Sequence, residues 1–322
     1  MIRRSAGLVA ACLLAFLLGT PARAAPVEMA RPSPSTNFEW PARLKPTDPG
    51  ALPPGATLDR AGHRIILTAP FMLMPIDFDG WYLDIDGTGL AVFIDPLFRS
   101  EGAGRVLQGG YNGGNPSLLV IGGRVDETGH NTRFESGFVW KGTGDATFLN
   151  TTWTGATLDY GSWYGSGKLE LIGGRVGAFC LSVSHDAHCE PFHIFSGKAW
   201  FRRVTWDMSA MKEAIAGGLT APSVFAEGYS GPIELRMEEN VFIGTDLISS
   251  PPNCAARCTA GTLYTVQASS PHFPVHIEAW RNRFIPGTSG HVFGLSEGKG
   301  GKVTIEFHDN VDARDGKPLR AH

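Results

Sequence analysis

The chain has 322 residues, with 28 Lys and Arg against 31 Asp and Glu, a formal net charge of −3, and acidic and basic residues intermixed. Nothing in it resembles the clustered basic footprint of a nucleic-acid-binding protein, so nucleic acid is not an expected partner. The 41 glycines, 22 prolines and 10% aromatic residues suit extended structure with many turns, and long stretches of helical periodicity are few.

The first 24 residues have the pattern of a secretory signal peptide. Arg3 and Arg4 precede an apolar run from Leu8 to Leu18, and Ala22-Arg23-Ala24 offers a small-x-small cleavage site. The run is too short to span a membrane stably, and no later segment reaches the required ~20 apolar residues. We therefore expect a secreted or periplasmic protein without a membrane span.

Residues 25–54 are rich in proline and poor in apolar periodicity, which predicts an extended arm or linker. Strands are expected from about Thr57 onward. The segments 63–68, 81–86 and 90–94 form either the first coils of a repeat or its cap, because terminal repeats differ from the others. Residues 55–322 are thus expected to form one domain that ends in a polar tail.

A short motif recurs seven times at irregular intervals: an apolar strand, a kink and one more large apolar residue. In the last three copies the kink is an asparagine, as in Leu235-Arg-Met-Glu-Glu-Asn240-Val-Phe242. Successive kinks lie between 23 residues (151 to 174) and 42 residues (240 to 282) apart, which fits a fixed unit with variable insertions. The kinks are Gly123, Thr151, Gly174, Val204, Asn240, Asn282 and Asn310.

A second strand precedes each motif and usually ends in a small residue, as in Phe138-Val-Trp-Lys-Gly142. Each unit therefore reads strand, turn, strand, kink, strand, which is one coil of a parallel β-solenoid. Asparagine and glycine suit the kink because they adopt left-handed backbone angles at low cost. Stacked asparagines can also bond to one another along the stack.

Over roughly residues 55 to 314 the chain resembles the right-handed parallel β-helices of the pectate-lyase-like superfamily. In that family an asparagine is common in the short turn between the second and third strands of a coil, where Asn240, Asn282 and Asn310 stand here. The resemblance implies an all-β, single-stranded right-handed parallel β-helix of about 8 to 10 coils with loop insertions. It implies the fold alone, because glycosidases, lyases, epimerases, adhesins and phage tailspikes share this scaffold.

Strand side chains alternate between the interior and the outer face. In the first strand of each coil, the residues expected to point inward are Leu107, Trp140, Phe195, Ala226 and Val266. Their neighbours then point outward, one per coil at ~4.8 Å spacing, in a polar ladder that could follow a polysaccharide. The alternative is the ordinary polar face of any solenoid. The outward neighbours are Gln108, Lys141, Ser196, Glu227 and Gln267.

The candidate catalytic residues are Lys141, Glu227 and His193, side chains that can accept or donate protons. The candidate substrate-binding residues are Gln108, Ser196, Gln267 and Trp163. His193 follows the loop Ser184-His185-Asp186-Ala187-His188, which could supply a general base or metal ligands. A solvated loop without a catalytic role is the alternative.

Asp84 and Asp86 form an Asp-x-Asp pair, which places both carboxylates on the same side of a strand, and Ca²⁺ takes several such oxygen ligands. Their spacing does not match the helix-loop-helix calcium loop, and turn formation by Asp-Gly explains much of the pattern. Calcium is the one cofactor that the sequence suggests.

Removal of the signal peptide would leave four of the five cysteines. An even number of cysteines in an exported protein predicts disulfides. Of the three pairings that four cysteines allow, the short spacings favour Cys180–Cys189 and Cys254–Cys258. A metal site at Cys254 and Cys258 is the alternative, but it lacks a second pair of ligands.

Two functions of different classes follow. The first is a carbohydrate-active enzyme, a lyase or glycoside hydrolase acting on an extracellular polysaccharide. The second is a non-catalytic β-helix that binds glycan or serves as a surface or envelope structural protein. The polygalacturonase set of paired aspartates, Gly-His-Gly and Arg-x-Lys is missing, which favours the second. The scaffold commonly hosts enzymes, which favours the first by analogy.

Overall fold

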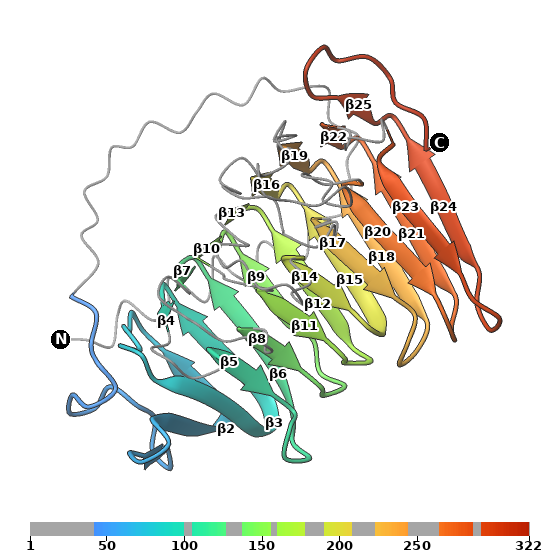
Figure 1. Ribbon diagram of the computed structural model, residues 1–322. Coiled ribbons are helices and arrows are strands. Elements are labelled where there is room, and N and C mark those ends of the chain that lie inside the picture. Colours follow the sequence, from blue (N-terminus) through green and yellow to red (C-terminus); the bar gives the residue numbers. More distant parts are fainter. Residues whose placement is uncertain are drawn as a thin grey trace, which may run out of the picture. The chain divides into compact units, whose positions relative to one another are not determined.

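The computed structural model of the chain describes residues 42–99, 105–126, 137–155, 160–177, 190–207, 223–243, 264–285 and 291–321. These residues belong to one compact unit, Trp40–His322. They are all β, and among them no helix could cross a membrane. Strands from successive repeats lie side by side and parallel (Figure 1), which is the solenoid-like arrangement that the repeats predict.

Three ladders of parallel strands hold nearly all of the described elements. The first ladder contains β5 (Leu107–Gly109), β8 (Phe138–Trp140), β11 (Gly161–Trp163), β14 (Phe192–Ile194), β17 (Val224–Glu227), β20 (Val266–Ser270) and β23 (Phe293–Glu297). The second ladder contains β2 (Arg64–Leu73), β3 (Tyr82–Ile94), β6 (Asn115–Ile121), β9 (Ala146–Leu149), β12 (Lys168–Ile172), β15 (Gly197–Arg202), β18 (Ile233–Glu238), β21 (Val275–Trp280) and β24 (Val303–His308). The third ladder contains β4 (Leu97–Arg99), β7 (Arg124–Asp126), β10 (Thr152–Thr154), β13 (Arg175–Gly177), β16 (Thr205–Asp207), β19 (Val241–Ile243), β22 (Arg283–Phe284) and β25 (Val311–Asp312).

Each repeat adds one strand to each of the three ladders in turn, and each strand pairs with its counterpart in the next repeat. Strand β3 runs through the corner between the first two ladders, because its start pairs with β5 and its end with β6. The first and second ladders therefore belong to one 17-stranded sheet, whereas the third is a separate sheet of 8 strands. This pairing brings equivalent positions of successive repeats into register.

The N-terminal end of the stack is covered. Strand β1 (Thr57–Asp59) pairs antiparallel with β2 and protects part of its edge. Part of the segment predicted to be an arm also packs here, because Leu44 bridges to Ile76 and Ala51 is buried in the core. Residues 25–41 lie outside the described part of the chain.

The third strand of each repeat contributes the large apolar side chain that the motif predicts. Trp153, Trp206, Phe242 and Phe284 are almost completely buried, and burial of such a side chain contributes about 1.5 to 3 kcal/mol. In the last repeat the equivalent position is Asp312, because it pairs with Phe284. Its carboxylate binds the guanidinium of Arg314 at 2.6 Å, so the final repeat differs from the others.

The kink prediction is correct for glycine and wrong for asparagine. Gly122, Gly123, Gly173 and Gly174 all have positive φ, as expected. At the asparagine kinks the left-handed residue is instead the one before the asparagine: Glu239, Arg281 and Asp309, with φ between 54° and 57°. An additional kink, at Asp95 before β4, was not predicted.

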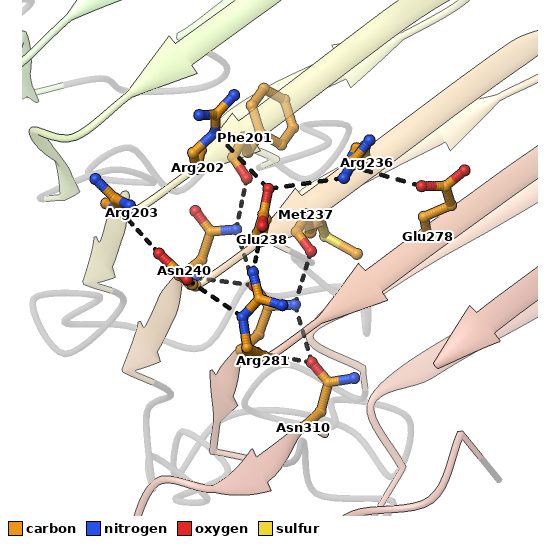
Figure 2. A network of polar contacts seen from close by, with 12 residues as sticks. Phe201, Arg202, Arg203, Arg236, Met237, Glu238, Asn240, Glu278, Arg281 and Asn310 are labelled. Atoms are coloured by element: carbon orange, nitrogen blue, oxygen red, sulfur yellow. Dashed lines mark hydrogen bonds and ion pairs between the residues drawn. The ribbon is translucent and has the colours of Figure 1, made fainter. Parts of the chain in front are cut away.

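The asparagines stack inside the turn and bond along the solenoid, as predicted. Asn282 donates its backbone N–H and its side-chain amide to Oδ1 of Asn310, at 2.8 and 2.9 Å. Asn240 contacts Oδ1 of Asn282 in the same way, at 2.9 Å in both cases. Each amide also donates to a backbone carbonyl of the preceding repeat, such as that of Phe201 or Met237 (Figure 2). These amides must face the interior, which leaves the left-handed turn to their neighbours.

Candidate functional site

Two rows of side chains run along the outer face of the first ladder. Row one aligns Gln108, Val139, Ser162, His193, Phe225 and Gln267. Row two lies two residues further along each strand and aligns Lys141, Tyr164, Phe195, Glu227 and Ser269. Four members of row one, Gln108, Val139, Ser162 and Phe225, are only 4% to 7% exposed. Row two, with stacked strands ~4.8 Å apart, is therefore the array that a chain-like ligand could follow.

The predicted outward ladder of five polar residues is wrong in its register. Gln108 and Gln267 belong to row one, whereas Lys141 and Glu227 belong to row two. Phe195, which was expected to point inward, lies on the outer face in row two. The four remaining residues expected to point inward are all buried.

The error arises from aligning the small residue that ends each first strand. Gly109 pairs with Trp140 and not with Gly142, so alignment of the glycines moves that strand by two residues. At Ser196 the slip is one residue, and its buried hydroxyl donates to the carbonyl of Tyr164 at 2.8 Å. A slip of one residue turns a strand side chain to the opposite face.

Trp163 lies in the core and not on the outer face. Its side chain is completely buried, and its ring stacks on that of Trp140 with centroids 6.3 Å apart and planes within 4°. A ring without exposed surface has no face to offer a ligand, so the substrate-binding prediction for Trp163 is corrected.

Two of the predicted catalytic residues, His193 and Glu227, are in contact. Nε2 of His193 lies 3.1 Å from Oε2 of Glu227. On the other edge of the ring, Nδ1 lies 3.0 Å from Oε1 of Glu190, an ion-pair distance without the direction of a good hydrogen bond. The rings of Phe195 and Phe225 stack against the imidazole, with centroids 3.7 and 4.5 Å away. A histidine is thus held between two carboxylates and two aromatic rings.

The three polar members differ in exposure, and this assigns their possible roles. The side chain of Glu190 is 1% exposed, that of His193 12% and that of Glu227 26%. Glu227 is therefore the member that a ligand on the outer face would reach most easily. Glu190 can orient and neutralise the ring from below, but it cannot touch a ligand without rearrangement.

Opposing effects act on the pKa of His193. Burial lowers this pKa, because desolvation disfavours the charged ring, whereas the contacts with Glu190 and Glu227 and their negative charges raise it. The net result is a pKa above the ordinary value of 6.5. The ring therefore keeps its proton to a higher pH than a free histidine, and when protonated it places a positive charge beside the Glu227 carboxylate.

Lys141 lies in row two but away from the histidine. Its Nζ is 4.1 Å from the ring centroid of Tyr111 and 5.5 Å from that of Tyr164. The Tyr164 ring in turn stacks on Phe195, with centroids 4.3 Å apart. Three strand steps separate Lys141 from Glu227, or about 14 Å along the row. The two side chains therefore cannot act on the same proton.

Asp84 and Asp86 are both engaged with protein donors. Oδ2 of Asp84 accepts a hydrogen bond from Asn112 at 3.1 Å and lies 3.9 Å from a nitrogen of Arg64, while its buried Oδ1 has no hydrogen-bond partner. Oδ1 of Asp86 accepts from the backbone N–H of Gly87 at 2.8 Å. Within the described part of the chain, no group of three or more His, Cys, Asp or Glu side chains could hold a metal ion.

Several predicted features lie outside the described residues. These are the signal peptide of residues 1–24, the loop Ser184–His188, and the two predicted disulfides Cys180–Cys189 and Cys254–Cys258.

Sequence reasoning missed Glu190 and the aromatic members of the two rows. Glu190 reaches the ring of His193 from three residues earlier, across the turn that begins β14, and no strand periodicity predicts that contact. Phe195 could have been found, because period-two spacing places it on the same face as His193.

Comparisons of the chain with protein-family models, with curated proteins and with solved structures found no match. The structure establishes the ladders of parallel strands, but it does not by itself identify a function. Function has to be argued from the side chains of the site.

Proposed function

We propose that the chain is a right-handed single-stranded parallel β-helix of the pectate-lyase-like superfamily, and that it acts on an extracellular polysaccharide. The observation that carries the function is the pair of His193 and Glu227 on an outer face whose side chains repeat at the strand spacing. The signal-peptide pattern of residues 1–24 and the even number of cysteines left after its removal support a secreted or periplasmic location.

The geometry favours a lyase over a glycoside hydrolase. Hydrolases of the common types need two carboxyl groups on either side of the scissile bond, with room for the sugar or a water between them. Here Glu190 and Glu227 contact opposite edges of one imidazole ring, and Glu190 is buried. The ring occupies the space that the hydrolytic reaction would need. Elimination requires only one accessible group that removes a proton.

In the proposed reaction, the Glu227 carboxylate removes a proton from the carbon beside the sugar's carboxylate. The bond from the neighbouring carbon to the departing sugar oxygen breaks, a carbon–carbon double bond forms, and the departing oxygen takes a proton from solvent. His193 is a positioning residue, because its Nε2 lies 3.1 Å from Oε2 of Glu227 and holds that carboxylate in place to accept the proton. We assign to Lys141 the binding of an acidic sugar, because it lies three strands away. Gln267 binds a sugar further along row one. Gln108, also predicted to bind substrate, takes no sugar, because the residue is 4% exposed and its Oε1 accepts a hydrogen bond from Arg105 at 2.6 Å.

A non-catalytic glycan-binding or surface protein is the second candidate. It is supported by the stack of Tyr164 on Phe195, since rings that cover each other in parallel, with centroids 4.3 Å apart, can serve packing alone. In that case row two would bind a glycan without cleaving it.

The test is turnover of a panel of acidic and neutral polysaccharides by the purified mature protein, following absorbance of unsaturated ends and formation of new reducing ends together. We expect unsaturated ends from an acidic polysaccharide. Glu227→Gln should lower the rate at least about 100-fold. Glu278→Gln, which changes a carboxylate of similar exposure on the second ladder, should stay within about twofold.

Each other outcome contradicts a defined part of the proposal. New reducing ends without unsaturated ends would show a hydrolase. Silence in both assays, combined with retained binding, would favour the non-catalytic candidate. Full activity of Glu227→Gln would show that the site lies elsewhere.

A further inference from the structure

An exposed aromatic pair lies at the turn that follows Glu227. Tyr229 is 57% exposed, one of the most exposed large apolar side chains in the described part of the chain. Its ring centroid is 5.1 Å from that of His272, which belongs to the equivalent turn of the next repeat. Phe273, beside His272, is itself 39% exposed. Neighbouring aromatic surface of this kind, next to a candidate site, is more informative than a single exposed ring.

Backbone hydrogen bonds fix this pair relative to the site. The N–H of Tyr229 donates to the carbonyl of Glu227 at 2.6 Å, and the N–H of Ser230 donates to that of Phe195 at 3.1 Å. The carbonyl of Gly228 accepts from the N–H groups of both His272 and Phe273, at 3.2 and 2.9 Å. The two turns are therefore held together beside row two, where strands β17 and β20 end.

Gly228 makes this close approach possible. A Cβ atom at Gly228 would lie 2.2 Å from the carbonyl oxygen of Phe273, so the position requires a residue without a side chain. Because the turn is built around this contact, Tyr229 is presented by a rigid backbone. A rigid aromatic side chain binds a ligand at little cost in conformational entropy.

We propose that Tyr229, supported by His272, is a stacking subsite for a sugar ring of the polysaccharide, one position beyond the residue attacked at Glu227. This inference rests on the proposed function and adds the residue that aligns the sugar chain beside Glu227 of row two. The face of an aromatic ring carries negative charge density and attracts the C–H groups of a pyranose, whereas the rings of Tyr164 and Phe195 cover each other. Tyr229 therefore offers an exposed ring where row two does not.

The test compares Tyr229→Ala, Tyr229→Phe and Met72→Ala, the last being a similarly exposed apolar residue, at 61%, on the second ladder. Turnover is measured on the polysaccharide of the panel that wild type cleaves best. Binding is measured separately, by affinity electrophoresis in gels that contain polygalacturonate, alginate or a neutral glucan, with each variant in a Glu227→Gln background.

Tyr229→Ala should raise KM and weaken binding about 3- to 10-fold, with kcat within about twofold, whereas Tyr229→Phe and Met72→Ala should match wild type. Unchanged KM and binding of Tyr229→Ala, with wild type active, would overturn the subsite and leave the proposed function standing. An equal loss in Met72→Ala would also overturn it. Wild type that neither cleaves nor binds any polysaccharide would overturn both proposals.

Discussion

The outer faces of the first and second ladders both carry carboxylates that are partly exposed, Glu227 at 26% and Glu238 at 19%, but the cationic side chains beside them differ in burial. On the second ladder and its kink, Glu238 contacts Arg202, Arg236 and Arg281 in an extended network (Figure 2). These arginines are between 37% and 47% exposed. On the first ladder, the imidazole ring of His193 is 12% exposed and lies between two carboxylates.

This difference in burial distinguishes an ordinary solvent-exposed ion-pair network from a candidate functional site. Exposed ion pairs contribute about 0 to 1 kcal/mol each, because water screens them and long side chains lose entropy when they pair. Buried charges cost several kcal/mol to desolvate and persist only with well-placed partners. Burial and not the number of charges therefore marks the first ladder as the face to test.

The largest expected effect tests whether the two faces differ in function. His193→Ala should lower kcat/KM on the cleaved polysaccharide about 10²- to 10⁴-fold, because Glu227 loses the side chain that holds its Oε2 in place. The matched control is His276→Ala, which removes a histidine near two carboxylates on the second ladder. Equal losses of kcat/KM in the two variants would contradict a functional difference between the two faces.

The next largest effect concerns the scaffold beneath the second face. Asn282→Ala should lower the free energy of unfolding by about 2 to 4 kcal/mol, because it leaves the N–H of Asn240 and the carbonyl of Met237 buried without partners. Arg283→Ala, at an exposed neighbouring position, should change it by less than about 0.5 kcal/mol. Urea unfolding measures both, and equal small changes would contradict a structural role for the asparagine stack.

A smaller effect is the pH dependence that His193 gives to stability. Because its pKa is raised in the folded protein, its stabilising contribution is fully present below the unfolded pKa of about 6.5 and is lost as pH rises through the folded pKa. The difference in unfolding free energy between wild type and His193→Gln should therefore shift against wild type as the pH rises above about 6.5. A difference that shifts in favour of wild type as pH rises would contradict the raised pKa.

The smallest effect is expected at the exposed network. Arg236→Met should change the free energy of unfolding by less than about 1 kcal/mol and leave polysaccharide turnover within about twofold. Urea unfolding at low and at high salt checks this, since added salt should reduce the difference further. A loss of several kcal/mol would show that the second face is as tightly coupled as the first.

The repeat could be predicted from the sequence because large apolar residues at fixed distance from a kink have one packing solution. Trp153, Trp206 and Phe242 show this. The backbone conformation of the kink could not be predicted from the sequence. An asparagine such as Asn282 suits the kink equally well as a left-handed residue and as an inward amide in a stack. The stack of Asn240, Asn282 and Asn310 requires inward amides, and that requirement decides between them.

The site was predicted only in part. His193 and Glu227 were identified by residue type, but their contact depends on a register that three- and four-residue strands do not specify. Glycines such as Gly109 and Gly142 look equivalent in sequence and occupy different positions in the strand pairing. Glu190 depends on a turn with no periodic signal.

The most direct test of the charged pair at the first ladder is an NMR titration of the His193 imidazole in wild type and in Glu227→Gln. The wild-type ring should titrate above its ordinary pKa of 6.5. The pKa should fall in the variant, because one of the two carboxylates that raise it against the effect of burial is then removed. A wild-type pKa at or below 6.5, or one that Glu227→Gln leaves unchanged, would contradict the pairing on which the proposed site depends.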